Sequence, residues 1–282
     1  MRALKLFVLF AIALALSCKK EPARTGCTNP NSFNYDPAAT VSDNSCIEMY
    51  GCLGFAPNYS NSGDIGVSFY NAYYDQKMAE EVYIQRNFFN GVPATVFVLY
   101  EPAPQYKNAY ATPDGRILFG YHMLFYTVSF YGELPVAGIL AHEWGHRIQF
   151  TFGFTQSKVY QTELEADAFS GFYMALAKQW AWSQIQSYYA SVYSNGDYNF
   201  NHPSHHGTPN QRLAAAYLGV TTAVKALQTN TQYTYQQLHN IFINEIKTNI
   251  APRYKNDFTD FPEVVYPKNL DAEAAKKLYP RP

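Results

Sequence analysis

The stretch from residue 134 to 151 constrains the fold of this chain more than any other part of its sequence. It contains no proline after Pro135, and a proline suits the first turn of a helix. Apolar residues recur along it at helical spacing, namely Val136, Ile139, Leu140 and Ile148. His142 and His146 stand four positions apart, so the predicted helix carries both on one face. Both imidazoles can therefore reach a single ion.

The two histidines belong to the sequence HEWGH at 142–146, which has the form HExxH. This spacing predicts a zinc site in which His142 and His146 are ligands and Glu143 is the catalytic base. Zinc lowers the pKa of a bound water from about 16 to about 7, so that Glu143 can take a proton from it near neutral pH. Taken alone, the motif leaves open two surface histidines on an ordinary helix.

A catalytic zinc needs a third protein ligand, and the sequence TELEAD at 162–167 offers carboxylates for it. Glu163 is the expected ligand, and Glu165 is the alternative. Asp167 lies four positions after Glu163 and is expected to accept the outer N–H of a ligand histidine. A structural interpretation competes with this one. Thr162 and Glu165 form a capping-box pattern, which would put Glu163 in the first turn of a helix without any metal.

A third group of polar residues precedes the next predicted helix. His206 could donate to the oxyanion of a tetrahedral intermediate, and Arg212 could pair with a buried carboxylate and hold this loop against the site. Thr208 and Pro209 also suit the cap and the first position of a helix. Capping and chemistry are compatible, so the two interpretations stand together.

These segments, and their order along the chain, resemble those of the neutral zinc metallopeptidases of bacteria. ILAHEWGHRIQ at 139–149 is similar to their active-site helix, ELEADAFSG at 163–171 to their second motif, and HGT with QR at 206–212 to their third. The resemblance runs from about 105 to 217. It implies His142, His146 and Glu163 as zinc ligands and Glu143 as base. The chain departs from the family before residue 105 and around Trp144 and Arg147.

The start of the chain predicts export. Residues 1–17 combine Arg2 and Lys5 with an apolar run of signal-peptide length, too short to span a bilayer. Cys18 follows a small residue, as in a bacterial lipoprotein cleavage site, so it is expected to carry the lipid on a tether over 18–25. We therefore expect an envelope protein anchored to the membrane. A plain secretory signal with an incidental cysteine is the alternative.

A small module bounded by cysteines is expected over 26–52. It is rich in Asn, Asp and Ser, and either holds calcium or is a disulfide-closed spacer. Cys46 can pair with either Cys27 or Cys52, and the sequence does not decide between them. The remaining residues, 53–282, are predicted to form the metallopeptidase domain.

The predicted fold class of that domain is α+β, zincin-like and mostly helical, with a small antiparallel or mixed sheet beside the HExxH helix. Helices are expected over 76–87, 134–151, 161–180, 208–228 and 234–249, and strands over 94–100 and 116–120. In zincins an edge strand pairs with an extended peptide. Ile117, Leu118 and Phe119 in the second strand are therefore the expected substrate platform.

The charge balance excludes one class of partner. The chain has 21 basic and 22 acidic side chains and no basic stripe, so nucleic acid is not expected to bind. Together, the motifs predict an envelope zinc endopeptidase that acts on peptides or proteins. Two alternatives remain: a lipoprotein that binds zinc as a scaffold without cutting, and a hydrolase of another bond such as a cell-wall amide. The intact Glu143 argues against the scaffold.

Overall fold

The computed structural model describes residues 23–26, 28, 39–44, 54–55, 65–192, 206–254, 261–268 and 270–282. The chain divides into two compact units, Met1–Glu48 and Met49–Pro282. In the first unit, β1 (Thr25–Gly26) pairs in parallel with β2 (Val41–Ser42). The predicted signal peptide, the lipidated Cys18 and the three cysteines expected to pair lie outside the described residues, and stay predictions.

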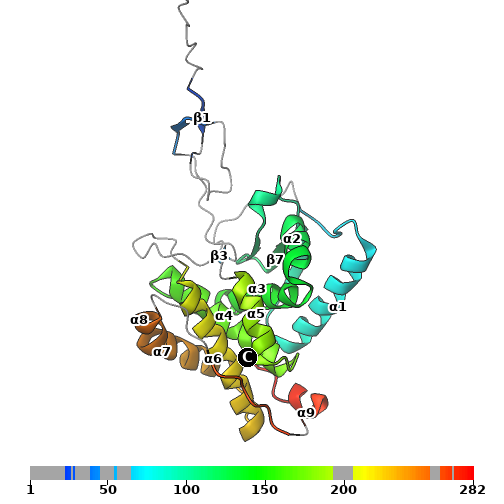
Figure 1. Ribbon diagram of the computed structural model, residues 1–282, viewed down its shortest axis with the longest axis vertical. Helices are drawn as coiled ribbons and strands as arrows, with labels where there is room; N and C mark the ends of the chain where they lie inside the picture. Colours follow the sequence, from blue (N-terminus) through cyan, green and yellow to red (C-terminus); the bar gives the residue numbers. More distant parts are fainter. Residues whose placement is uncertain are drawn as a thin grey trace, which may run out of the picture. The chain divides into compact units, whose positions relative to one another are not determined.

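The second unit is mostly helical and carries a small mixed sheet, which confirms the α+β class (Figure 1). Its strands are β3 (Gly54–Phe55), β4 (Ile65–Gly66), β5 (Thr95–Leu99), β6 (Ala109–Ala111) and β7 (Arg116–Gly120). Its longer helices are α1 (Ala72–Phe88), α2 (Tyr121–Tyr131), α3 (Leu134–Phe152), α4 (Val159–Leu176), α5 (Trp182–Val192), α6 (Pro209–Thr229) and α7 (Tyr235–Glu245). A π-helical turn over Ile246–Ile250 and the short helices α8 (Ala251–Arg253) and α9 (Ala272–Lys276) follow.

The sheet has the strand order β3-β6-β7-β5-β4 among the described residues. β6 and β7 are antiparallel and are joined by the turn that the sequence TPDG predicts. β5 runs parallel to β7, β4 antiparallel to β5, and β3 parallel to β6. α3 packs against β6 and β7, so the sheet lies beside the helix that carries the HExxH residues.

Local signals account for several helix ends. α3 has Pro135 in its first turn and ends at Gly153, whose φ of 69° is in the left-handed region that favours glycine. α6 begins at a capping box formed by Thr208 and Gln211, as expected for Thr208. The competing interpretation, in which Thr162 caps the helix and places Glu163 in its first turn, is wrong. α4 begins three residues before it, because Lys158 occupies the N-cap position, and Glu163 therefore lies beyond the first turn.

Helix α4 is the centre of the helical part, packed between α3 and α6 (Figure 1). Gly145 lets α3 approach closely, because a Cβ built there would be 2.8 Å from the Cα of Ala166. On its other side α4 approaches α6 closely at Gly171, where a Cβ would meet the carbonyl of Ala216. Close approach on both sides leaves nearly all of α4 buried.

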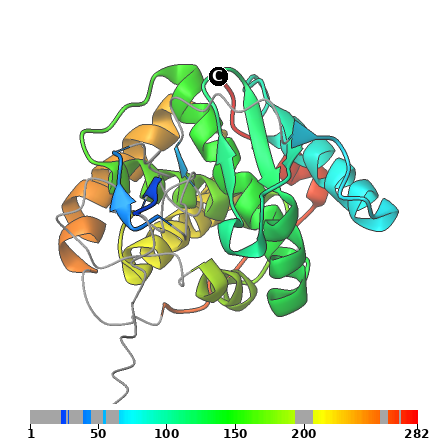
Figure 2. The same ribbon diagram turned by 90° about the horizontal axis from the view of Figure 1, so that it is seen from above.

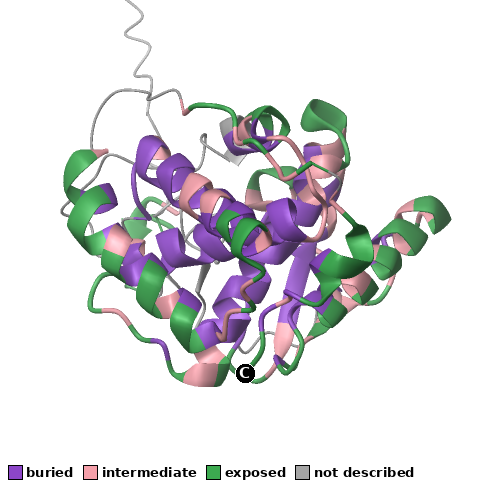
Figure 3. Ribbon diagram, turned by 90° about the horizontal axis from the view of Figure 1, so that it is seen from below, coloured by how far each residue is buried: buried purple, intermediate pink, exposed green. Residues whose placement is uncertain are grey.

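Seen from above, α1 (cyan) and α7 (orange) lie on opposite sides of the second unit (Figure 2). The residues of α3 and α4 are mostly buried, whereas α1 and α7 each expose one face (Figure 3). None of the described helices combines the length and apolar character that a bilayer-spanning helix needs. The functional side chains of α3 and α4 are thus held in the interior of the unit.

Candidate metal centre

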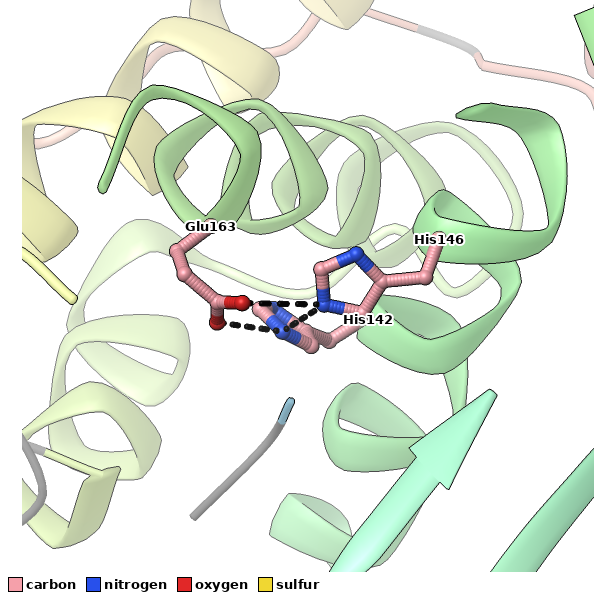
Figure 4. Close-up of side chains that lie close together, drawn as sticks. All are labelled: His142, His146 and Glu163. Carbon is pink, nitrogen blue, oxygen red and sulfur yellow. Dashed lines mark hydrogen bonds and ion pairs between the residues drawn. The ribbon is translucent and has the colours of Figure 1, made fainter. Parts of the chain in front are cut away.

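Three side chains from α3 and α4 meet in the interior and could hold a metal ion. They are His142, His146 and Glu163, and each is fully buried (Figure 4). The Nε2 atoms of the two histidines are 3.0 Å apart. The Glu163 carboxylate places Oε2 3.5 Å from Nε2 of His142 and Oε1 3.5 Å from Nε2 of His146. Helical spacing brings the histidines together, and the close packing at Gly145 brings the carboxylate to them.

These distances fit a tetrahedral ion. With bonds of about 2.0–2.1 Å, tetrahedral coordination separates neighbouring ligand atoms by about 3.3 Å. The two Nε2 atoms are 3.0 Å apart, and each lies 3.5 Å from a different oxygen of the Glu163 carboxylate. Neither oxygen of Glu163 has a hydrogen-bond partner among the described residues, although the group is buried. A buried carboxylate without such a partner beside two imidazole nitrogens suits a cation, and two nitrogens with one oxygen suit zinc.

Glu143 is also fully buried, and neither of its oxygens has a hydrogen-bond partner among the described residues. Burial raises the pKa of this carboxyl to about 7, against the opposing effect of His146 and His142. Ala111 in β6 lies close enough for its backbone to lower that pKa in part. Glu143 thus lies near both the histidine pair and β6, with its carboxylate available to another group.

The outer nitrogen of His142 contacts a buried ion pair. Its Nδ1 atom lies 2.9 Å from Oδ1 of Asp167, and the Arg212 guanidinium donates to both oxygens of that carboxylate at 2.8 Å. Burial would lower the pKa of His142, but Asp167 and Glu163 raise it to about 9. Burial would raise the pKa of Asp167, but Arg212 and His142 lower it. The geometry expected of Asp167 and Arg212 is therefore present.

The outer nitrogen of His146 contacts an amide instead. Nδ1 of His146 lies 2.8 Å from Oε1 of Gln149, whose Nε2 donates to the carbonyl of Thr162 and to Oε2 of Glu165. The other oxygen of Glu165 lies 2.5 Å from Nδ1 of His239. Glu165 is thus engaged with Gln149 and His239, and of the two carboxylates considered as third ligand it is Glu163 that joins the histidines.

His206 lies at the edge of the same cluster. Its Nδ1 atom is 3.9 Å from Oε1 of Glu163, and the residue is 7% exposed. The residue precedes the capping box of α6, so the cap that starts this helix also holds the histidine near the ligands. The neighbouring His202 and His205 lie outside the described residues.

The structure contradicts the premise that the expected substrate platform is an edge strand. β7 is hydrogen-bonded to β5 on one side and to β6 on the other, so it is not an edge strand. Ile117, Leu118 and Phe119 are fully buried. Because the TPDG turn folds residues 109–120 into a hairpin, β6 rather than β7 lies nearer to α3. Gly54 and Phe55 of β3 pair with the outer side of β6 and also lie against α4.

Three further residues support the site without having been predicted to do so. Arg147 donates to the carbonyls of Pro93 and Thr112, which holds the β6–β7 hairpin against α3. Gln149 contacts His146, and its position three residues later on the same helix face could have indicated this. His239 is far away in the sequence, so nothing in the local pattern pointed to it.

Comparison with known proteins identified no relative of this chain. No protein-family model, curated protein or solved structure matches the chain significantly. What the site can do must therefore be argued from its own side chains.

Proposed function

We propose that this protein is a zinc metallopeptidase with a zincin-like arrangement of α3, α4 and the sheet. The observation that supports it most is the meeting of His142, His146 and Glu163 at distances that suit a tetrahedral ion, with Glu143 beside them. An ordinary structural cluster does not account for two buried glutamates whose carboxylate oxygens have no hydrogen-bond partner among the described residues. A metal and a reactive water would give those oxygens partners.

The proposed chemistry divides roles among the residues of the site. A zinc ion held by the three ligands would supply Lewis acidity and lower the pKa of a bound water to about 7. Glu143 would accept the proton of the attacking water and deliver it to the leaving nitrogen of the peptide. Its raised pKa, about 7, suits a group that both takes and returns a proton near neutral pH. His206 would donate to the oxygen of the scissile carbonyl as negative charge develops there.

An extended peptide is the substrate that this arrangement suits best. The backbone of β6 lies close to Glu143, and the outer side of β6 is paired with the two-residue edge strand β3. A substrate would pair with β6 through main-chain hydrogen bonds in the place that β3 takes. Export to the cell envelope and anchoring through Cys18 are part of the proposal and rest on the sequence of the first residues.

Metal analysis with a parallel assay of two substrates tests the proposal. The purified protein should hold one zinc per chain, and His146→Ala and Glu163→Gln should each lose it. The wild type should cleave a peptide library and leave peptidoglycan fragments intact. Glu143→Gln should abolish cleavage while zinc content stays unchanged. Absence of zinc from the wild type, or equal activity of Glu143→Gln, would overturn the proposal, and cleavage of peptidoglycan alone would assign a different bond.

A further inference from the structure

We propose that Gln149 is a positioning residue for the ligand His146, and that Glu165, held by His239, keeps Gln149 in place. The inference rests on the proposed metal centre and adds to it a set of residues that controls metal affinity. It assigns a role to three buried or nearly buried polar side chains that the ligand set and the proposed mechanism leave unused.

The hydrogen bonds of Gln149 determine which way its amide points. Nε2 is 2.8 Å from the carbonyl oxygen of Thr162 and 3.0 Å from Oε2 of Glu165. A backbone carbonyl can only accept, so the NH₂ end of the amide must face it. The reversed amide would place oxygen against oxygen at Thr162. The carbonyl end of Gln149 is therefore directed at His146.

The orientation of the amide in turn determines the tautomer of His146. Oε1 of Gln149 can only accept, and it lies 2.8 Å from Nδ1 of the ring. Nδ1 must therefore carry the hydrogen, which leaves the lone pair of a neutral ring on Nε2. Nε2 is the atom that faces His142 and Glu163. Gln149 thus holds the ring as a ligand needs it, in orientation and in tautomer.

Glu165 and His239 complete the support from a second direction. Glu165 is fully buried and has one partner on each oxygen, Gln149 and His239. The His239 ring is stacked on Phe154, with 4.1 Å between ring centroids. Because His239 lies on α7 and Gln149 on α3, the position of α7 is coupled to the orientation of the ligand. His142 has a charged partner in Asp167, whereas His146 has a neutral amide.

The chain offers a closely matched control for removing a buried glutamine amide. Gln85 is fully buried, and its Nε2 donates to the carbonyl of Ala137 at 2.8 Å and to Oε1 of Glu81 at 2.9 Å. These are the same kinds of partner, at nearly the same distances, that Nε2 of Gln149 has. Gln85→Met therefore removes the same two donor contacts, without a contact to a metal ligand.

The test compares Gln149→Met with Gln85→Met in the full-length protein. Zinc affinity is measured by chelator competition, the visible spectrum of the cobalt-substituted protein reports ligand geometry, and thermal unfolding in EDTA reports stability. We expect Gln149→Met to weaken zinc binding about 10- to 100-fold and to alter the cobalt spectrum. Gln85→Met should change stability by a similar amount and leave both metal readouts unchanged. Equal zinc affinities in the two variants would overturn the inference.

Two further variants keep the test decisive if Gln149→Met does not fold. Glu165→Gln preserves an acceptor for Gln149 and should retain the affinity for zinc, whereas His239→Ala removes the distal support and should lower it several-fold. Wild-type zinc affinity in His239→Ala would show that the proposed support is wrong, and so would a loss in Glu165→Gln as large as that expected of Gln149→Met. Failure of the wild type to bind zinc would instead overturn the proposed function, so the two failures are distinguishable.

Discussion

His142 and Asp167 are joined by a contact of 2.9 Å between Nδ1 and Oδ1, one helix contributing the ring and the next the carboxylate. Arg212, from a third helix, donates to both oxygens of that carboxylate. All three side chains are buried, so the charge of Asp167 is balanced only within this group and its neighbours. One ion pair therefore serves both the stability of the helical core and the orientation of a ligand.

Removing the cation of this pair should be costly. Arg212→Met leaves the Asp167 carboxylate buried without its main partner, and we expect the free energy of unfolding to fall by about 3–5 kcal/mol. Arg116→Met, which removes a partly exposed partner of Asp114, should cost about 1 kcal/mol or less. Urea denaturation of both variants measures the difference. Similar losses of unfolding free energy in the two variants would mean that the buried ion pair contributes no more to stability than the exposed one.

Replacing both partners should separate stability from metal binding. In Asp167→Leu/Arg212→Met no buried charge is left without a partner, so much of the stability lost in Arg212→Met should return. Zinc affinity should stay about 10- to 100-fold below the wild type, because His142 has lost its outer acceptor. Denaturation and chelator competition on the same samples check both statements. Recovery of affinity together with stability would contradict the orienting role of Asp167.

The separation of α3 and α4 should control metal affinity. In Gly145→Ala the new methyl group would press on the Cα of Ala166, a backbone atom, so we expect a loss of about 1–3 kcal/mol in stability. Since Glu163 moves with α4, zinc affinity should fall as well. Gly171→Ala introduces a closer clash, with the carbonyl oxygen of Ala216 in α6, and serves as the control. Its stability should fall while its zinc affinity changes less than in Gly145→Ala. A larger loss of zinc affinity in Gly171→Ala would contradict the role proposed for Gly145.

The buried carboxyl of Glu143 should make stability depend on pH once metal has been removed by a chelator. Its pKa of about 7 is above its ordinary value of 4.5, because burial disfavours the charged form. The folded state therefore holds the proton more tightly, and the stability due to this group is lost as pH rises from about 4.5 to about 7. Glu143→Gln should not show this loss of stability, because an amide does not ionise. Above pH 7 it should exceed the wild type by roughly 3 kcal/mol.

Denaturation of wild type and Glu143→Gln at several pH values checks this prediction. The two curves should converge below about pH 4.5, where the wild-type carboxyl is protonated in both states. A stability difference that does not vary with pH would show that Glu143 ionises freely in the folded protein.

His206 should affect turnover more than metal binding. It lies 3.9 Å from a ligand oxygen and belongs to the loop before α6 rather than to the ligand set. In His206→Gln we expect kcat to fall about 100-fold or more, with KM and zinc content nearly unchanged. His122→Gln, a substitution in the first turn of α2, is the control and should have no effect. Loss of zinc from the His206 variant would make it a ligand instead of a donor.

The sequence by itself determined the features that depend on spacing along one helix. The i and i+4 positions of His142 and His146 put both rings on one face of the helix. The position of Glu143 next to His142 places its carboxylate in the same turn. The cap at Thr208 and the mostly helical α+β class follow from similarly local signals. Such signals act over a few residues, so they can be read without knowing what the helix packs against.

Only the tertiary structure decided which groups from separate elements meet. The choice of Glu163 over Glu165 depends on the angle at which α4 packs on α3, and the contact of His239 with Glu165 depends on where α7 docks. The place of β6 beside the site depends on a hairpin whose first strand is only three residues long. Packing of this kind is set by close contacts such as that of Gly145 with Ala166, and their partners are distant in the sequence.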